Sequence, residues 1–444
     1  MLKRNLVILL PLFWSFFCIA QTKVWTLDEC IRYAEEHNTD IQKKSLFIVK
    51  ANLDLQDSKW AFVPSLSASS GYTESSGRVL DPTTYQFVQT NLTSNSSSSV
   101  EGKIMLFEGG RKLKNLEKSK LSLKASLLKE ESARFNLKLN VIAAYMDVLC
   151  AGEQIAIAKK SAELIDEQLA RSQCLLEVGS ITESDVLQLR AQLFAAENDI
   201  SSAQRSEMMA KLTLCDLLEI EEYESFCATE ISTIEMHRTI TNIETVAQNN
   251  PDYKVCVLNL KLAESDYKIA KAALYPSISL SAGYGSSWSD SRKKTIQNPD
   301  GTIRYEAYPF FEQYVDNASA YVSLGLKIPI LTGLSARNTA KRTEVAIKEA
   351  MLATAEAYKQ VRKQILQAQI DCDAARDEYL RAQTEVHYAE EAQRQLSEKY
   401  NLGTTDYMSW DTALIDYSKA LYFAAELKYK FLLTSFKLHV LLND

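Results

Sequence analysis

Few side chains in this sequence are placed to perform catalysis or to bind a metal. The four histidines, His37, His237, His387 and His439, lie far apart, and the phosphate-binding loop, the zinc-protease motif and the serine-hydrolase motif do not occur. Seven cysteines follow residue 20, an odd number with wide spacing and no C-x-x-C pair. The sequence therefore predicts no enzyme, no cofactor, no disulfide framework and no metal site.

Polar side chains gather instead at two turns. The segments EVGSITESDV (177–186) and YNLGTTDYMSW (400–410) each place one glycine, Gly179 or Gly403, between long stretches that are nearly free of glycine and proline. Asp406 and Asp411 follow the second glycine. Carboxylates are favoured at the start of a helix, where they accept hydrogen bonds from free backbone N–H groups.

The N-terminus has the pattern of a secretory signal peptide over residues 1–20. Lys3 and Arg4 precede an apolar run, and Cys18-Ile19-Ala20 resembles a cleavage site. Lipidation of Cys18 is the alternative. The run is shorter than the ~20 residues that span a bilayer as a helix, and we expect no transmembrane helix elsewhere. An exported protein with a net charge of −7 is not expected to bind nucleic acid.

The elements that must position the two turns are long helices. Residues 111–178 contain one glycine and no proline, and residues 334–402 contain neither after Gly333. A continuous helix of roughly 70 residues would be about 100 Å long. Residues spaced alternately three and four apart form an apolar stripe in each half, which favours lengthwise coiled-coil packing. The stripes are Val186, Leu189, Leu193, Ala196, Ile200 and Ala203, and Trp410, Ala413, Tyr417, Ala420, Ala424, Leu427 and Phe431.

The chain is an internal duplication. Motifs of the first half recur in the second half in the same order and at nearly constant spacing. Pro64, Gly71 and Tyr72 recur as Pro276, Gly283 and Tyr284, and Gly179 recurs as Gly403 at a slightly larger offset. We expect a first repeat over 21–235 and a second over 236–444, each with a helix, a strand, a polar loop, a strand and a helical hairpin. The predicted helices are 26–62 and 241–274, the predicted strands are 64–73, 99–108, 276–286 and 318–331, and the hairpin tips lie near 179 and 403.

The predicted strands alternate between apolar residues and small polar ones. The apolar set includes Ile278, Leu280, Tyr284, Val322, Leu324 and Leu326, and serine or glycine occupies most of the opposite face. A half-buried soluble strand alternates too, but the flanking segments offer no core to cover this apolar face. A membrane β-barrel turns such a face to lipid and the polar face to its lumen. Four strands cannot close a barrel, so the chain must share one: three copies supply twelve strands, and two supply eight.

These features together resemble the TolC family of outer-membrane efflux proteins. The motifs that carry the resemblance are NNPDYKV, ALYPSISLSAGYG, LFEGGR and the two turn segments, and they cover about 26–440. The resemblance implies an α+β membrane protein: a trimeric 12-stranded β-barrel, with four strands per chain, continued by a long α-helical coiled-coil tunnel through the periplasm. It implies a homotrimer in the outer membrane of a Gram-negative bacterium, contacting outer-membrane lipid, a periplasmic adaptor and an inner-membrane pump.

The resemblance also implies a gate at the periplasmic hairpin tips, around Gly179 and Gly403. A tyrosine and an aspartate that hydrogen-bond in the family correspond to Tyr400 and Asp185. An arginine of the same latch corresponds to Thr405. Two aspartates that narrow the family's tunnel entrance correspond to Ser409 and Thr412. Asp406 and Asp411 lie close by in a different register and either replace that ring of charge or cap the start of the helix; both interpretations stay open.

Two functions follow from these patterns. The first is a passive channel, gated at its periplasmic end, that exports small molecules or proteins as the exit duct of a tripartite efflux or type I secretion complex. The alternative is a soluble periplasmic coiled-coil adaptor or scaffold, which has hairpins but needs no lipid-compatible strands. A scaffold should purify in buffer alone, whereas a barrel needs detergent.

Overall fold

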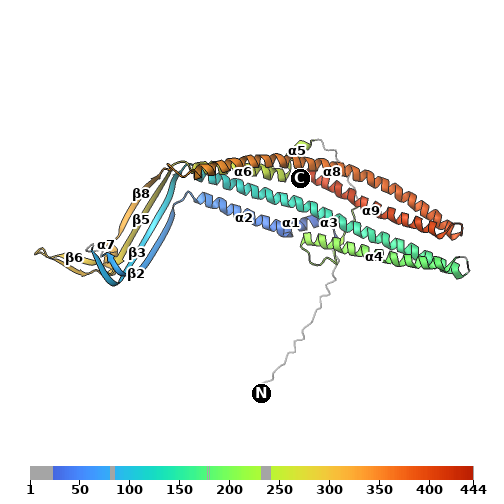
Figure 1. Cartoon of the computed structure of the whole chain (residues 1–444), viewed down its shortest axis with the longest axis horizontal. Coiled ribbons are helices and arrows are strands. Elements are labelled where there is room, and N and C mark those ends of the chain that lie inside the picture. Colours follow the sequence, from blue (N-terminus) through green and yellow to red (C-terminus); the bar gives the residue numbers. More distant parts are fainter. Residues whose placement is uncertain (1–23, 81–85, 178, 180, 232–241, 444) are drawn as a thin grey trace, which may run out of the picture. The chain divides into compact units, whose positions relative to one another are not determined.

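The computed structural model describes residues 24–80, 86–177, 179, 181–231 and 242–443. The expected signal peptide and the expected junction between the repeats lie outside these ranges. The elements in chain order are β1 (Val24–Trp25), α1 (Leu27–His37), α2 (Thr39–Trp60), β2 (Ser65–Leu80), β3 (Phe87–Glu108), α3 (Arg111–Glu177), α4 (Glu183–Leu218), β4 (Cys227–Ala228), α5 (Ile243–Asn249), α6 (Pro251–Ala272), β5 (Ser277–Ser289), β6 (Lys293–Gln297), β7 (Ile303–Ala307), α7 (Phe310–Asp316), β8 (Ser319–Lys327), α8 (Ser335–Asn401) and α9 (Tyr407–Asn443) (Figure 1).

The two halves of the chain repeat the same order of main elements. Helices α2 and α6 have 22 residues each, and α3 and α8 have 67 residues each. Helix α6 follows α2 at the offset that relates Pro276 to Pro64, and α8 follows α3 at the offset that relates Gly403 to Gly179. The added residues lie between β5 and β8, where the second half carries β6, β7 and α7. This correspondence supports the predicted duplication.

The described chain divides into two compact units, and each draws on both halves of the sequence. The first contains the described residues of 1–42, 133–246 and 363–444, and the second contains the described residues of 43–132 and 247–362. The boundary falls within α2, α3, α5 and α8. The repeats therefore do not form separate units.

The second unit contains an antiparallel sheet of four strands in the order β2-β3-β5-β8 (Figure 1). Its register aligns the alternating patterns: Leu280 pairs with Leu324, and the adjacent Ser279 pairs with Gly325. One face is therefore apolar and the other is rich in serine and glycine, as predicted. Val322 and Leu324 on the apolar face are 77% and 69% exposed. Strands β2 and β8 are the two edges of the described sheet.

Strands β2 and β3 extend well beyond the predicted segments. The stretch 74–98 was predicted to be a polar loop, yet β2 continues to Leu80 and β3 begins at Phe87. Serine hydroxyls pair across these strands, for example Ser70 Oγ with Ser98 Oγ at 2.8 Å. The apolar alternation stops here although the ladder continues, because backbone hydrogen bonds and serine hydroxyl contacts extend it without an apolar face. At the other end, β8 stops at Lys327 rather than at 331, shortly before Pro329, which has no N–H to donate.

Each predicted first helix is divided in two. The helix expected over 26–62 becomes α1 and α2, separated by Asn38, whose ψ of 127° leaves the helical region. The Asn38 amide donates to the Leu217 carbonyl of α4 at 3.1 Å, and its Oδ1 accepts from the Asp40 N–H at 3.0 Å. The helix expected over 241–274 becomes α5 and α6, with Asn250 as N-cap and Pro251 in the first turn. The predicted capping box at Thr26 and Glu29 is present.

The first unit has a helical core in which α1, α3, α4 and α9 meet. Cys30, Val141 and Leu214 are fully buried there. Tyr145 is also buried, and its hydroxyl donates to the carbonyl oxygens of Trp25 (3.0 Å) and Thr229 (2.7 Å). Among the described residues, α3 is the one helix long and apolar enough to cross a membrane, contrary to our expectation of none. Half of its apolar window is buried within the protein, so the core explains its composition.

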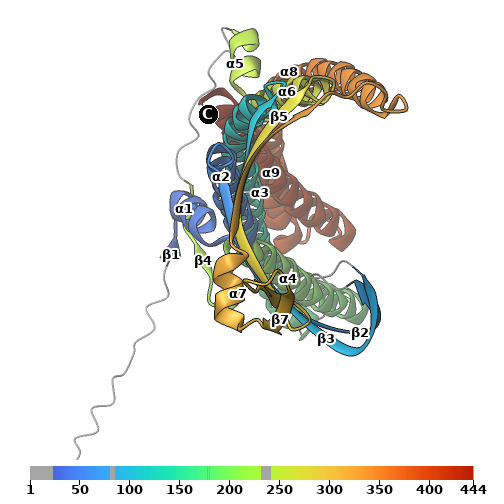
Figure 2. The same cartoon turned by 90° about the vertical axis from the view of Figure 1, so that its left-hand side faces the viewer.

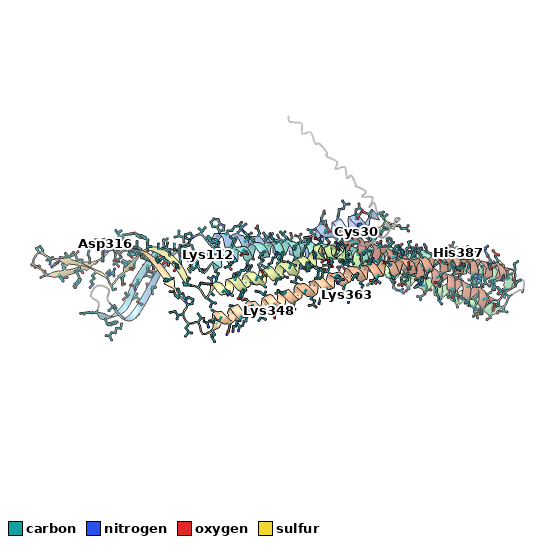
Figure 3. The ribbon with its side chains drawn as sticks, turned by 90° about the horizontal axis from the view of Figure 1, so that it is seen from above. Cys30, Lys112, Asp316, Lys348, Lys363 and His387 are labelled. Carbon is teal, nitrogen blue, oxygen red and sulfur yellow. The ribbon has the colours of Figure 1, made fainter. Side chains whose placement is uncertain are left out.

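Helix α7 completes the outer end of the sheet in the second unit (Figure 2). Beyond Gly285, β5 has no partner in β8. Gln313, which is fully buried, accepts from the Ser289 N–H at 2.6 Å and donates to the Ser289 carbonyl at 3.1 Å. The Asn317 amide donates to the Ser287 carbonyl at 2.7 Å. Asp316 at the end of α7 accepts from Tyr308 Oη at 2.5 Å (Figure 3). Beyond Gly285, the side-chain amides of Gln313 and Asn317 therefore bond to β5 where β8 no longer pairs with it.

Candidate functional site at the hairpin tips

Each helical hairpin turns at a glycine in a left-handed conformation. Gly179 between α3 and α4 has a φ of 75°, and Gly403 between α8 and α9 has a φ of 68°. Residues with a Cβ rarely adopt these angles, which explains the glycine at each tip. The Gly403 N–H donates to the Tyr400 carbonyl at 3.0 Å, and the Thr404 N–H donates to the Lys399 carbonyl at 2.9 Å. These bonds end α8 and fix where the next helix starts.

The two hairpins pack against each other near these turns. Tyr400, Tyr407 and Trp410 form an aromatic group with ring centroids 5.9–6.3 Å apart. The group belongs to a buried cluster that includes Leu169 of α3 and Leu189 of α4. Most of both predicted stripes is buried, as lengthwise packing requires. The buried members are Val186, Leu189, Ala196 and Ala203, and Trp410, Ala413, Tyr417, Ala420, Leu427 and Phe431.

Polar contacts also join the hairpins. At the tip, Gln192 Nε2 of α4 donates to Asp411 Oδ1 of α9. Farther from the turns, Lys160 Nζ of α3 donates to the Tyr417 hydroxyl of α9 at 3.2 Å. Lys428 Nζ pairs with Glu153 Oε2 at 2.6 Å. A hydrogen bond to a charged acceptor contributes about 1.5–3 kcal/mol. Among the described tip residues, Gln192–Asp411 is the bond of this kind that joins the two hairpins.

The hydrogen bond expected between Tyr400 and Asp185 is not formed, and that prediction was wrong. Asp185 Oδ2 accepts instead from the Thr182 N–H at 3.1 Å and from Thr182 Oγ1 at 2.9 Å, in a capping box that starts α4. Thr182 and Asp185 are three residues apart at the start of a helix, so they meet as soon as the helix forms. A bond from Asp185 to Tyr400 would instead require two distant helices to be positioned, and the capping box forms in its place. The Asp185 charge still acts on Tyr400 and Tyr407. Burial, and secondarily this carboxylate, raises the pKa of Tyr400 above its usual value.

Of the remaining tip residues, Asp406, Ser409 and Thr412 make contacts within their own helix end, and Asp411 does not. Asp406 precedes α9 and accepts from Ser409 Oγ; this hydroxyl lowers the pKa of Asp406. Asp406 therefore acts as a helix cap, one of the two interpretations left open. Thr412 Oγ1 donates to the Met408 carbonyl of its own helix at 2.8 Å. Asp411 departs from the capping interpretation, because its partner is Gln192 on the other hairpin.

Three residues at the tip were not singled out as gate residues from the sequence. Trp410 could have been found, since it begins the second stripe. Tyr407 lies next to it but carries no spacing signal of its own, and Gln192 precedes the stripe residue Leu193 as an ordinary polar position. Their importance follows from which helices face each other.

The serine-rich face of the sheet carries a second notable group. Glu101, Gly283 and Tyr321 lie in one row across β3, β5 and β8. The Tyr321 ring covers Gly283 so closely that a Cβ on Gly283 would lie 2.5 Å from Tyr321 Cε1. The Tyr321 hydroxyl lies beside the Glu101 carboxylate. Glycine at 283 therefore lets the tyrosine ring lie flat against the sheet.

No group of three or more metal-ligating side chains occurs among the described residues. Cys30 on α1 and His387 on α8, labelled in Figure 3, illustrate how these residue types are spread over separate helices.

Solved structures with the same fold are outer-membrane channels. The chain aligns with CusC over 94% of its length and 91% of that chain, with a TM-score of 0.79 and 16% identity. It aligns with the Campylobacter jejuni CmeC outer membrane channel over 94% of its length and 85% of that chain, also with a TM-score of 0.79 and 16% identity. The structure thus has the fold of an outer-membrane channel protein.

The sequence identifies the family. Residues 30–218 and 242–444 match the outer membrane efflux protein family, and the chain belongs to it. TolC of Vibrio cholerae is 23% identical over 52% of this chain and 50% of that protein, and the pyoverdine export protein OpmQ of Pseudomonas putida is 24% identical over 47% and 44%. The chain thus aligns with about half the length of these relatives. Its place is the outer membrane of a Gram-negative bacterium.

Proposed function

We propose that this protein is the outer-membrane exit channel of an export system. Three copies close one 12-stranded barrel through their four-stranded sheets, and their long hairpins continue it as a helical tunnel into the periplasm. The channel is passive and carries out no catalysis. Energy comes from an inner-membrane pump, which a periplasmic adaptor joins to the tunnel.

The observation that carries this proposal is the open four-stranded sheet. Its edge strands, β2 and β8, leave unpaired backbone N–H and C=O groups, and its apolar face is exposed. In lipid, an unpaired backbone group costs several kcal/mol, so spanning sheets are closed barrels. Joining β8 of one copy to β2 of the next satisfies both edges. It also turns Ile278, Leu280, Tyr284, Val322, Leu324 and Leu326 to lipid and the serine-rich face to the lumen.

The hairpin tips are the proposed gate. Gly179 and Gly403 place the turns, and Asp185, Asp406 and Ser409 start the following helices. Tyr400 and Asp411 connect the hairpins, and Thr412 lies on the exposed side of α9. The names of the relatives support an export role, and pyoverdine export by OpmQ is one example. The cargo of this chain depends on its pump.

Assembly and conduction test this proposal. Purified in detergent, the protein should have the mass of a trimer by light scattering corrected for detergent, and it should form ion channels in planar bilayers. A folded monomer, or a protein that stays soluble in buffer without detergent and conducts no current, would instead establish the periplasmic scaffold.

A further inference from the structure

Five polar atoms buried at the hairpin tips have no hydrogen-bond partner. They are Gln168 Nε2 and Ser172 Oγ of α3, Gln192 Oε1 of α4, Tyr400 Oη of α8 and Tyr407 Oη of α9. The Ser172 side chain is completely buried, and Gln168, Tyr400 and Tyr407 are 3%, 7% and 7% exposed. Within the described part of the chain, these are all the buried side-chain atoms of this kind. Their confinement to one place indicates a site.

The five atoms line one seam between the hairpins. Ser172 Oγ lies close enough to the Tyr400 hydroxyl to lower the pKa of Tyr400, although the two atoms do not meet in hydrogen-bonding geometry. Gln168 lies one helical turn before Ser172 on the same face of α3. The Tyr400 and Tyr407 rings are 6.3 Å apart. The charges of Asp411 and Asp185 both act on Tyr407, and Gln192 is bonded to Asp411. The orphaned groups therefore face one another across four helices.

The chemistry of the group selects its ligand. Gln168 Nε2 can only donate, Gln192 Oε1 can only accept, and the three hydroxyls can do either. A metal ion would satisfy the oxygen atoms and leave the amide nitrogen unpaired. Water donates and accepts, and buried water typically makes about three hydrogen bonds to such groups. We propose that ordered water occupies this seam and bridges α3 and α4 to α8 and α9, in place of a direct bond between Tyr400 and Asp185.

The hydrated seam bears on gating, and this consequence rests on the proposed function. When the hairpins separate, hydrogen bonds to internal water are replaced by equivalent bonds to bulk water. The tyrosines therefore resist opening less than a direct tyrosine–carboxylate latch would. At the tip itself, the direct link between Gln192 and Asp411 is then the remaining polar restraint between the hairpins.

X-ray radiolytic footprinting with mass spectrometry tests the site on the intact protein. Hydroxyl radicals formed from ordered internal water oxidise the side chains beside it, even where bulk solvent does not reach. Tyr400 and Tyr407 should be oxidised several-fold faster than Tyr145 and Tyr417. These two control tyrosines are buried at least as deeply, and protein groups pair with their hydroxyls. Equal rates at all four tyrosines would overturn the proposal.

A second variant separates internal water from simple exposure of an open tip. Gln168→Met with Ser172→Ala replaces both polar groups of α3 by apolar ones, which removes the partners on α3 that hold water beside Tyr400. Oxidation of Tyr400 should then fall toward the rate of the controls. If it stays high, bulk solvent reaches the seam and the proposal fails. The oxidation rates do not depend on conduction, so a protein that forms no channel would reject the proposed function and leave the hydrated seam standing.

Discussion

At the scale of single residues, partner choice at the tip decides how the hairpins are held. Asp185 is used locally by Thr182, whereas Asp411 reaches across to Gln192. Both are aspartates in the first turns after a tip glycine, and they differ in which helix face they occupy. The restraint in this chain therefore lies on α4 and α9. The position where the family latch has an arginine is Thr405, which brings no charge.

Asp411→Ala should open the tip. It removes a bond of about 1.5–3 kcal/mol. In the proposed trimer three such bonds contribute roughly 4.5–9 kcal/mol, a range that includes the roughly 5.5 kcal/mol that moves an equilibrium from 1:99 to 99:1. Single-channel conductance in planar bilayers should rise. Asp416→Ala is the matched control, because Asp416 is an exposed carboxylate on the same helix. Equal conductance of the two variants would contradict the assignment of Asp411 to the gate.

Gly283→Ala should destabilise the sheet. The new Cβ would lie 2.5 Å from Tyr321 Cε1, so the ring must leave its place. Overpacking of this kind costs about 1–3 kcal/mol. Thermal unfolding should show a lower midpoint than for Gly71→Ala, where the added Cβ meets only Ser97 Oγ at 3.9 Å. Adding Tyr321→Ala should recover much of the loss. A midpoint equal to that of Gly71→Ala would show that the ring moves without cost.

At the scale of elements, α7 shows how residues inserted between two strands can pack and hydrogen-bond against the same sheet. The second half of the chain has additional residues between β5 and β8, and they return to the sheet through Gln313 and Asn317. Trp288 and Phe310 pack beside them, with ring centroids 5.3 Å apart. On the side of β5 where β8 ends, side chains therefore take the place of a neighbouring strand, while β3 continues along the other side.

Gln313→Leu should loosen this end of the sheet. The change keeps the volume and removes both hydrogen bonds to Ser289, whose buried N–H and C=O then cost about 1–3 kcal/mol each. Hydrogen exchange at Ser289 should accelerate while exchange at Leu280 stays unchanged. Gln297→Leu on the exposed strand β6 serves as control. Unchanged exchange at Ser289 would mean that another group satisfies its backbone.

At the scale of the whole molecule, the proposed barrel requires the two faces of the sheet to meet different solvents. Leu280 and Ser279 are neighbours in sequence and lie on opposite faces of β5, next to Leu324 and Gly325. In one subunit both faces are accessible, so only assembly in a membrane distinguishes them.

Leu280→Arg should therefore impair membrane assembly, and Ser279→Arg should not. A charge on the lipid face costs about 2–4 kcal/mol near the bilayer midplane, whereas a charge on the lumen face remains in water. The trimer fraction in outer-membrane extracts, measured by light scattering, should fall for the first variant alone. Equal damage from both substitutions would reject the proposed orientation of the faces.

The sequence by itself determined the repeating elements of this protein. The breaker-free stretches predicted the long helices α3 and α8, the constant offsets between recurring motifs predicted the matching halves, and the period-2 pattern predicted which residues of β5 and β8 share a face. These features depend on residues a few positions apart, whose geometry is set by the period of a helix or strand.

Only the tertiary structure decided where the strands and helices end and which side chains bond across them. The polar continuation of β2 and β3 has no apolar period to reveal it, because cross-strand backbone bonds and serine hydroxyls hold it. The break at Asn38 depends on the Leu217 carbonyl, which is distant in sequence. At the tips, Gln192 meets Asp411 because α4 faces α9, while the nearer Thr182 occupies Asp185. Which side chains meet across helices depends on how the helices face each other, and the periodicity of one sequence does not contain that information.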